Sequence, residues 1–128
     1  MTKRWEVVTV GEIYGDHVFS GMKDWPEPGE EIFTRNYLCE LGGGAAITAC
    51  GLARLNRKAA VFGVIGEVEA TWMEERMRSF GVETAGLKRV PTARSGVTVS
   101  LSVREERTFF SYAGTNEMLS DYLLSSGV

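Results

Sequence analysis

The chain combines two kinds of predicted β-strand, and this combination limits the folds open to it. Glu6–Val10 and Ala59–Val64 are short runs rich in β-branched and apolar residues, as expected of strands that are buried on both faces of a parallel sheet. Gly96–Val103 instead alternates apolar residues with Thr and Ser, and it forms a predicted hairpin with Arg107–Tyr112. We therefore expect an α/β fold with a parallel core, flanking helices and a separate β flap.

Two helices are predicted between these strands. Ala45–Leu55 is rich in Ala and Leu and opens on a glycine turn, and Glu69–Phe80 repeats apolar residues at helical spacing before Gly81. The remaining predicted elements are extended segments at Ile13–Phe19, Glu31–Leu41 and Val82–Leu87, a loop at Gly21–Gly29 and a helix that begins at Leu119. Two or three core strands are fewer than such a sheet usually has, so we expect the fold to be incomplete at its carboxyl end.

Composition argues against several classes of protein. The 128 residues carry a formal net charge of -3 and no basic run, which argues against a nucleic-acid or anionic-membrane partner. The longest apolar stretch, Ala59–Ile65, is too short to cross a bilayer, and no signal peptide is recognisable, so we expect a cytoplasmic protein. Cys39 and Cys50 are expected to be reduced, buried thiols, and His17 to be structural. No metal-ligand spacing and no nucleophile–base arrangement stands out.

The first candidate site residue is Asp16, which follows the opening strand. In open α/β sheets, ligands bind beyond the carboxyl ends of the strands, and a carboxylate there can accept two hydroxyl hydrogen bonds, as a sugar diol would offer. Asp is also common in turns, so this pattern alone leaves both interpretations open.

The second candidate is the turn Gly42-Gly43-Gly44 at the start of a predicted helix. Glycines allow close approach of a ligand, and the first N–H groups of a helix lack partners within the helix. A dinucleotide-binding domain is an alternative, but its fingerprint needs a third glycine where this chain has Ile47. It also needs an acidic residue after the next strand, where Phe62 and Gly63 stand. We therefore do not favour it.

A third candidate is the aromatic face of the predicted flap. Thr108, Phe110 and Tyr112 share one face of a strand. Such a stripe could cover a ligand and exclude water, and it could equally be a packing face or a dimer contact.

Taken in order, several segments resemble the amino-terminal part of the ribokinase-like (PfkB) carbohydrate kinases. They are VVTVGEIYGDHV, WPEPGEEI, LGGGAAITACGLARL followed by AAVFGVIGEVEA, and SGVTVSLSV followed by ERTFFSYAGTN. The resemblance implies a three-layer αβα core with a β-strand lid. By it, residues 1–128 are the amino-terminal portion of a single sugar-kinase domain, with lid strands at about 13–41 and 96–112.

The resemblance also implies roles for particular residues. Asp16 would hold sugar hydroxyls, Gly43 and Gly44 would offer backbone contacts, and the further pocket candidates are Tyr14, Arg107 and Tyr112. Ile47 departs from the family, which usually has an Asn there that touches the sugar, so a divergent sugar or nucleoside kinase is the expected identity.

The resemblance assigns the chemistry to a part of the family that this chain lacks. Members transfer the γ-phosphoryl group of ATP, with Mg²⁺, to a sugar hydroxyl, and their catalytic base lies in a Gly-x-Gly-Asp segment. No such segment occurs in the 128 residues, so we expect no catalytic, nucleotide-binding or metal-binding residue here and no activity of the chain alone. Lids of this family often pair, which implies a homodimer through the lid. The alternative function is a non-catalytic lobe that binds a sugar or a protein partner.

Overall fold

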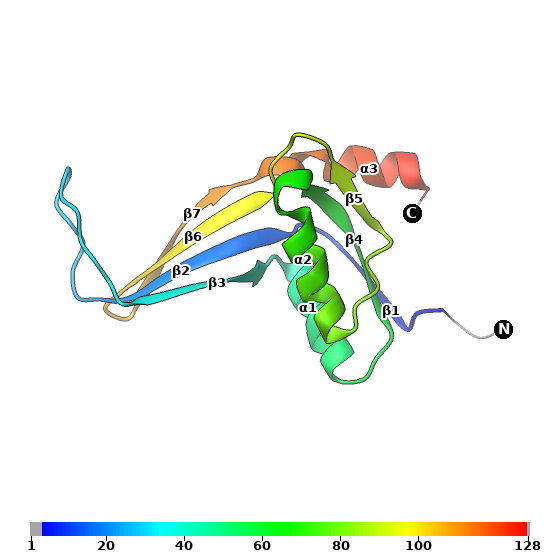
Figure 1. The fold of residues 1–128 in the computed structure, drawn as a ribbon, viewed down its shortest axis with the longest axis horizontal. Helices are drawn as coiled ribbons and strands as arrows, with labels where there is room; N and C mark the ends of the chain where they lie inside the picture. Colours follow the sequence, from blue (N-terminus) through cyan, green and yellow to red (C-terminus); the bar gives the residue numbers. More distant parts are fainter. Residues whose placement is uncertain (1–3, 128) are drawn as a thin grey trace.

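The computed structural model describes residues 4–127 and contains two β-sheets (Figure 1). The core sheet is parallel, with the order β1-β4-β5, and consists of β1 (Val7–Val10), β4 (Ala59–Gly66) and β5 (Leu87–Val90). The lid sheet extends away from this core with the order β3-β2-β6-β7. Its strands are β2 (Tyr14–Met22), β3 (Asn36–Gly42), β6 (Gly96–Val103) and β7 (Glu106–Tyr112). The predicted combination of a parallel core and a flap is confirmed.

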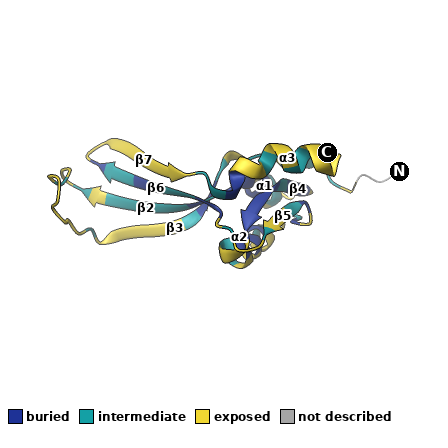
Figure 2. Cartoon of the chain, turned by 90° about the horizontal axis from the view of Figure 1, so that it is seen from above, coloured by how far each residue is buried: buried dark blue, intermediate teal, exposed yellow. Residues whose placement is uncertain are grey.

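Helices lie on both faces of the core sheet, which gives three layers. Helices α1 (Gly44–Arg54) and α2 (Glu67–Phe80) cover one face, and the 3-10 helix η1 (Gly114–Met118) and α3 (Leu119–Ser126) lie on the other. Figure 2 shows α2 and α3 on opposite sides of β4. None of the helices in the described part of the chain is long and apolar enough to span a bilayer.

The main hydrophobic core lies between the core sheet and helices α1 and α2. Val61 and Ile65 of β4 and Met73 and Met77 of α2 are fully buried there. Burial of a side chain of this size contributes about 1.5–3 kcal/mol. The facing side of α1 consists largely of alanines, which allow the helix to lie close to the sheet.

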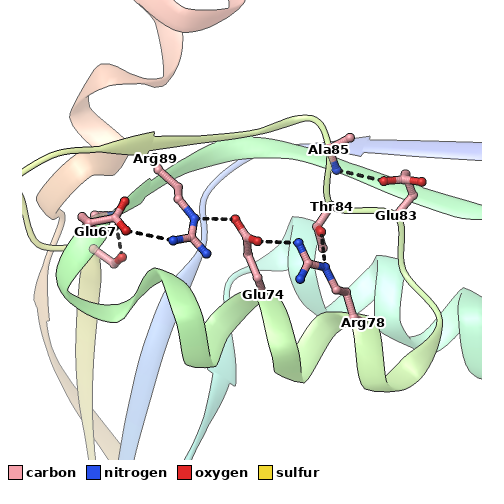
Figure 3. Close-up of polar contacts among 9 residues, drawn as sticks. Glu67, Glu74, Arg78, Glu83, Thr84, Ala85 and Arg89 are labelled. Atoms are coloured by element: carbon pink, nitrogen blue, oxygen red, sulfur yellow. Dashed lines mark hydrogen bonds and ion pairs between the residues drawn. The ribbon is translucent and has the colours of Figure 1, made fainter.

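A buried carboxylate fastens β5 to α2 (Figure 3). Glu74, which is 7% exposed, accepts hydrogen bonds from Arg78 at 2.8 Å and from Arg89 of β5 at 2.9 Å. Arg89 also donates to Glu67 at 2.8 Å, and Arg78 donates to Thr84 at 3.0 Å. A buried carboxylate is tolerated because both of its oxygens are paired.

The third core strand lies later in the chain than predicted. Val82–Leu87 forms only a single parallel bridge, Glu83 with Ala60, and the strand proper is Leu87–Val90. Its sequence, LKRV, has no strand periodicity, and pairing with β4 together with the Arg89 ion pairs overrides the weak local preference. The predicted strand at Glu31–Leu41 likewise begins only at Asn36.

Two predictions about burial are wrong. Val8 and Val10 of β1 are 42% and 44% exposed, because β1 is an edge strand of the core sheet and it is the opposite face, which carries Thr9, that packs against α1. Cys39 is exposed, whereas Cys50 is buried as expected. Cys39 lies on β3, an edge strand of the lid, where no helix layer covers the sheet.

Candidate functional site

The junction between the two sheets is held by one amide side chain. Ile13 lies between β1 and β2, and its N–H donates to Asn116 Oδ1 at 2.9 Å, while Asn116 Nδ2 donates to the Ile13 carbonyl at 2.9 Å. Asn116 also donates to the Ala113 carbonyl at 2.9 Å and is only 5% exposed. This double contact fixes the point where the chain leaves the core sheet and enters the lid.

Asp16 lies on β2, in register with Glu40 on one side and Thr98 on the other. Its carboxylate packs against the backbone of Gly42, where an added Cβ would lie 2.2 Å from both carboxylate oxygens. No group among residues 4–127 donates a hydrogen bond to this half-buried carboxylate, and burial raises the pKa of Asp16 while the nearby His17 lowers it. Asp16 therefore presents free acceptor positions beside the glycine turn.

The glycine turn that follows β3 begins helix α1. Gly43 is its N-cap residue with φ +90°, and a Cβ there would lie 2.3 Å from the Glu12 carbonyl oxygen, so only glycine fits. Gly44, the first helical residue, has no atom within 4 Å of a Cβ position. No side chain caps the helix, and the first N–H groups are available to an acceptor. The structure thus brings Asp16, Gly43 and Gly44 together.

Tyr14 lies on the same face of β2 as Asp16, two residues earlier. Its ring covers Gly96, where a Cβ would lie 2.6 Å from the ring, and its hydroxyl donates to Glu12 at 3.3 Å. Burial, followed by the carboxylate of Glu12, raises the pKa of the Tyr14 hydroxyl. Tyr14 therefore forms one wall beside Asp16.

Two hydroxyl groups extend this polar face across the lid. Thr98 is in register with Asp16, and Ser111 is in register with Thr98. Their hydroxyl oxygens lie 2.9 Å apart. Sequence reasoning did not single out this pair, although the alternation of Thr98 within its strand and the hairpin register would have placed both hydroxyls on one face.

Arg107 and Tyr112 do not lie beside Asp16. Tyr112 is in register with Val97 and through it with Gly15, so it lies on the opposite face of the lid. Arg107 shares the face of Asp16 but lies four residues along β7 from Ser111, which is about 13 Å. Phe110 and Thr108 share the face of Tyr112, so the predicted aromatic stripe covers the side of the lid away from Asp16.

The surroundings of the glycine turn differ from those of a dinucleotide-binding fold. In that fold the glycine loop follows a parallel strand of the core sheet. Here it follows β3, which pairs antiparallel to β2 in the lid. Within residues 4–127 there is also no group of three or more His, Cys, Asp or Glu side chains arranged to hold a metal ion.

Comparison with known proteins agrees with this arrangement. The model of the pfkB family carbohydrate kinases matches residues 5–126. A comparison with curated protein sequences finds no match.

Solved structures of ribokinases and a nucleoside kinase share the fold. Ribokinase from Cryptococcus neoformans var. grubii serotype A, in complex with ADP, is 27% identical with a TM-score of 0.73, over 85% of this chain and 35% of that one. Arabidopsis thaliana ribokinase, complexed with ribose and ATP, is 20% identical with a TM-score of 0.76, over 88% and 37%. The nucleoside kinase of Burkholderia thailandensis, in complex with inosine, is 19% identical with a TM-score of 0.73, over 85% and 37%.

This chain thus spans little more than a third of the length of these solved relatives. The family model covers nearly all of it, including every strand and helix described above. The chain belongs to the pfkB family of carbohydrate kinases.

Proposed function

We propose that this chain is the sugar-binding end and the lid of an ATP-dependent kinase that phosphorylates a hydroxyl of a sugar or nucleoside. The observation that supports the proposal most directly is the position of the Asp16 carboxylate. It is half-buried, receives no hydrogen bond from residues 4–127, and lies against the glycine turn that begins α1. A group of this kind gains its missing hydrogen bonds when a polyhydroxy ligand binds.

Each proposed contact follows from the chemistry of the groups. Asp16 accepts hydrogen bonds from two neighbouring hydroxyls, and the N–H groups of Gly43 and Gly44 donate to other ligand oxygens. Tyr14 closes the side of the site. Arg107 and Tyr112 lie away from Asp16, so we leave them out of the proposed contact set.

The phosphoryl-transfer step needs groups outside this set. In the full-length protein, ATP with Mg²⁺ supplies the γ-phosphoryl group, and a base removes the proton of the substrate hydroxyl. By family resemblance that base is the aspartate of a Gly-x-Gly-Asp segment, which residues 1–128 do not contain. The role of this chain is to bind and orient the acceptor hydroxyl and to shield it from water, and we expect this enzyme to act in the cytoplasm.

Ile47 indicates the class of acceptor. Its side chain is 57% exposed on the first turns of α1, and the family resemblance implies an Asn that contacts the sugar at this position. An apolar side chain there removes one hydrogen-bonding partner and favours a substrate with an apolar group at that point. Two of the relatives bind ribose and inosine, and the proposed class of substrate is accordingly a pentose or a nucleoside.

The test is sugar binding by the full-length enzyme with Asp16→Ala, measured by isothermal titration calorimetry. Loss of both hydrogen bonds to a charged acceptor, each contributing about 1.5–3 kcal/mol, should weaken binding at least about 100-fold. Arg107→Ala serves as a matched lid variant and should leave the affinity within about threefold. Unchanged affinity in Asp16→Ala would refute the assignment.

A second function, a non-catalytic lobe that associates through its lid, is favoured by the apolar outer face of that lid. Tyr37, Phe110 and Tyr112, on the side of the lid away from Asp16, are 56%, 60% and 60% exposed. An apolar hollow of about 450 Å³ lies between this face and the 23–35 segment. Exposed apolar patches of this kind mark protein contacts. Sedimentation velocity should show a homodimer that Phe110→Ser weakens, and a monomer at every concentration would count against lid pairing.

The first proposal predicts that the 128-residue chain alone does not transfer phosphate. Phosphoryl transfer from ATP to a sugar by this chain alone would contradict the proposal that the catalytic groups lie outside it.

A further inference from the structure

A second hollow lies between helices α1 and α2, below the end of β3, and its volume is about 340 Å³. Ile47, Cys50 and Gly51 of α1 form one wall, Phe80 of α2 forms another, and Leu41 of β3 closes the end. Because β3 belongs to the lid and both helices belong to the core, the hollow lies at the joint between the two parts of the molecule (Figure 1).

Two arginines border this apolar space, and only one of them is neutralised. Arg76 forms two hydrogen bonds with Glu40, from Nε to Oε1 at 2.9 Å and from Nη2 to Oε2 at 2.6 Å. Arg54 lies 5.9 Å from the centroid of the Phe80 ring and makes no ion pair with a carboxylate of the described residues. The hollow therefore carries one uncompensated positive charge.

A guanidinium group is well suited to a carboxylate. Its planar fork of donors matches the two carboxylate oxygens, and it is weakly hydrated, so it can bind next to an apolar surface. The flexible side chain of Arg54, on the last turn of α1, can turn its donors toward an anion seated in the hollow.

Gly51 keeps the hollow open. It lies in the interior of α1, where Gly is less favourable than Ala by about 0.5–1 kcal/mol. No atom lies within 4 Å of its Cβ position, so neither a close backbone contact nor a positive φ requires a glycine here. Because Gly51 lines the hollow, a larger side chain at this position would occupy part of its space.

From these observations we propose that the hollow binds a small amphipathic monoanion, namely a carboxylate on an apolar body. The apolar body packs between Ile47 and Phe80, and the carboxylate pairs with Arg54. A space of 340 Å³ equals the liquid volume of about 11 water molecules at about 30 Å³ each, which is room for a small organic acid. This site offers a cation and apolar walls, whereas the site around Asp16 offers a carboxylate and backbone N–H groups, and Ile47 is the one residue that both proposals use.

Position gives the site a means to influence the lid. Glu40, the partner of Arg76, is in register with Asp16 on the neighbouring strand. A ligand that contacts Leu41 of the lid and both core helices would fix the angle between the lid and the core.

The test uses 3-phenylpropanoate, which has an apolar ring and one carboxylate, and its neutral isostere 3-phenylpropanamide. Binding to the 128-residue chain is followed by amide chemical-shift changes in ¹⁵N-labelled protein. We expect the carboxylate to shift Ile47, Gly51 and Phe80 and to bind at least tenfold more tightly than the amide. Arg54→Gln should weaken binding of the carboxylate at least tenfold. Arg57→Gln, three residues further along the chain and beyond the end of α1, should not change its affinity.

Two blocking variants complete the test. Gly51→Leu places a larger side chain in the hollow and should abolish binding of the carboxylate, with far-ultraviolet circular dichroism as the check that the chain is folded. If this variant does not fold, Ile47→Trp narrows the hollow from the same helix and should have the same effect on binding. The proposal would be overturned if the acid and the amide bind equally well, or if Arg54→Gln and Arg57→Gln have equal effects on binding. It would also be overturned if a folded blocking variant still binds the carboxylate, or if millimolar ligand causes no chemical-shift changes.

Discussion

Replacing Gly42 by alanine separates the position of the Asp16 carboxylate from the rest of the fold. A Cβ at residue 42 would lie 2.2 Å from both carboxylate oxygens, far inside van der Waals contact. Because those oxygens are at the end of a side chain that can rotate, the fold can relieve the clash by turning Asp16 outward, at a cost of about 1 kcal/mol. Gly42→Ala should therefore preserve folding and move the carboxylate away from the glycine turn.

The expected loss of affinity follows from the contacts that Asp16 is proposed to make. Two hydrogen bonds to a charged acceptor contribute about 1.5–3 kcal/mol each, so displacement of the carboxylate should cost about 3–6 kcal/mol, more than 100-fold in sugar affinity. Calorimetric titration of the full-length enzyme with ribose and with inosine measures this loss. Gly51→Ala is the matched control, because no atom lies within 4 Å of its Cβ position and it lies outside the proposed sugar contacts.

The same variant has a readout that needs no ligand. Burial raises the pKa of the Asp16 carboxyl, so moving the carboxylate into water should return its pKa toward the ordinary value of an aspartate. Carbon-detected nuclear magnetic resonance of the Asp16 carboxyl in the 128-residue chain measures this directly. A variant that keeps both the raised pKa and the sugar affinity would show that Asp16 does not pack against Gly42 as described.

Three further predictions concern stability and pH. Glu74→Ala should destabilise the chain by about 1.5–3 kcal/mol in urea denaturation, because β5 and α2 lose the hydrogen bond from Arg89 to this carboxylate. Arg57→Ala breaks an exposed ion pair and should cost less than about 1 kcal/mol, and equal costs would contradict the ranking. Asn116→Ala should cost about 2–4 kcal/mol, since the buried backbone groups of Ile13 lose their partner, whereas a cost near zero would show that the junction does not depend on this clamp. Sugar affinity should fall as the pH is lowered through the pKa of Asp16, because a protonated carboxyl accepts fewer hydrogen bonds. Since the pKa of Asp16 is raised, the fall should occur at a higher pH than for an aspartate with an ordinary pKa. At pH values above this raised pKa, the ionised carboxylate of Asp16 destabilises the folded state. Asp16→Asn should therefore raise the free energy of unfolding at pH 7, and a variant that is less stable than the parent would contradict this expectation.

Local sequence patterns determined most of the secondary structure. The alternation in Gly96–Val103, the helical spacing in Glu69–Phe80 and the glycine at residue 81 predicted elements that the structure confirms within a few residues. These patterns are local because a strand or helix exposes one face at a fixed period whatever its partners are. The family resemblance, rather than a local pattern, implied that Asp16 and the glycine turn contact the same sugar and therefore lie close together.

Only the tertiary structure decided which faces and which edges are covered. The strand at Leu87–Val90 owes its existence to β4 and to the ion pairs of Arg89, which no local pattern encodes. The exposure of Cys39 follows from its place on an edge strand, and Tyr112 lies away from Asp16 because the register of three strands assigns it to the opposite face. Register and layer order depend on contacts between residues far apart in the chain, so they are properties of the folded molecule rather than of any single segment.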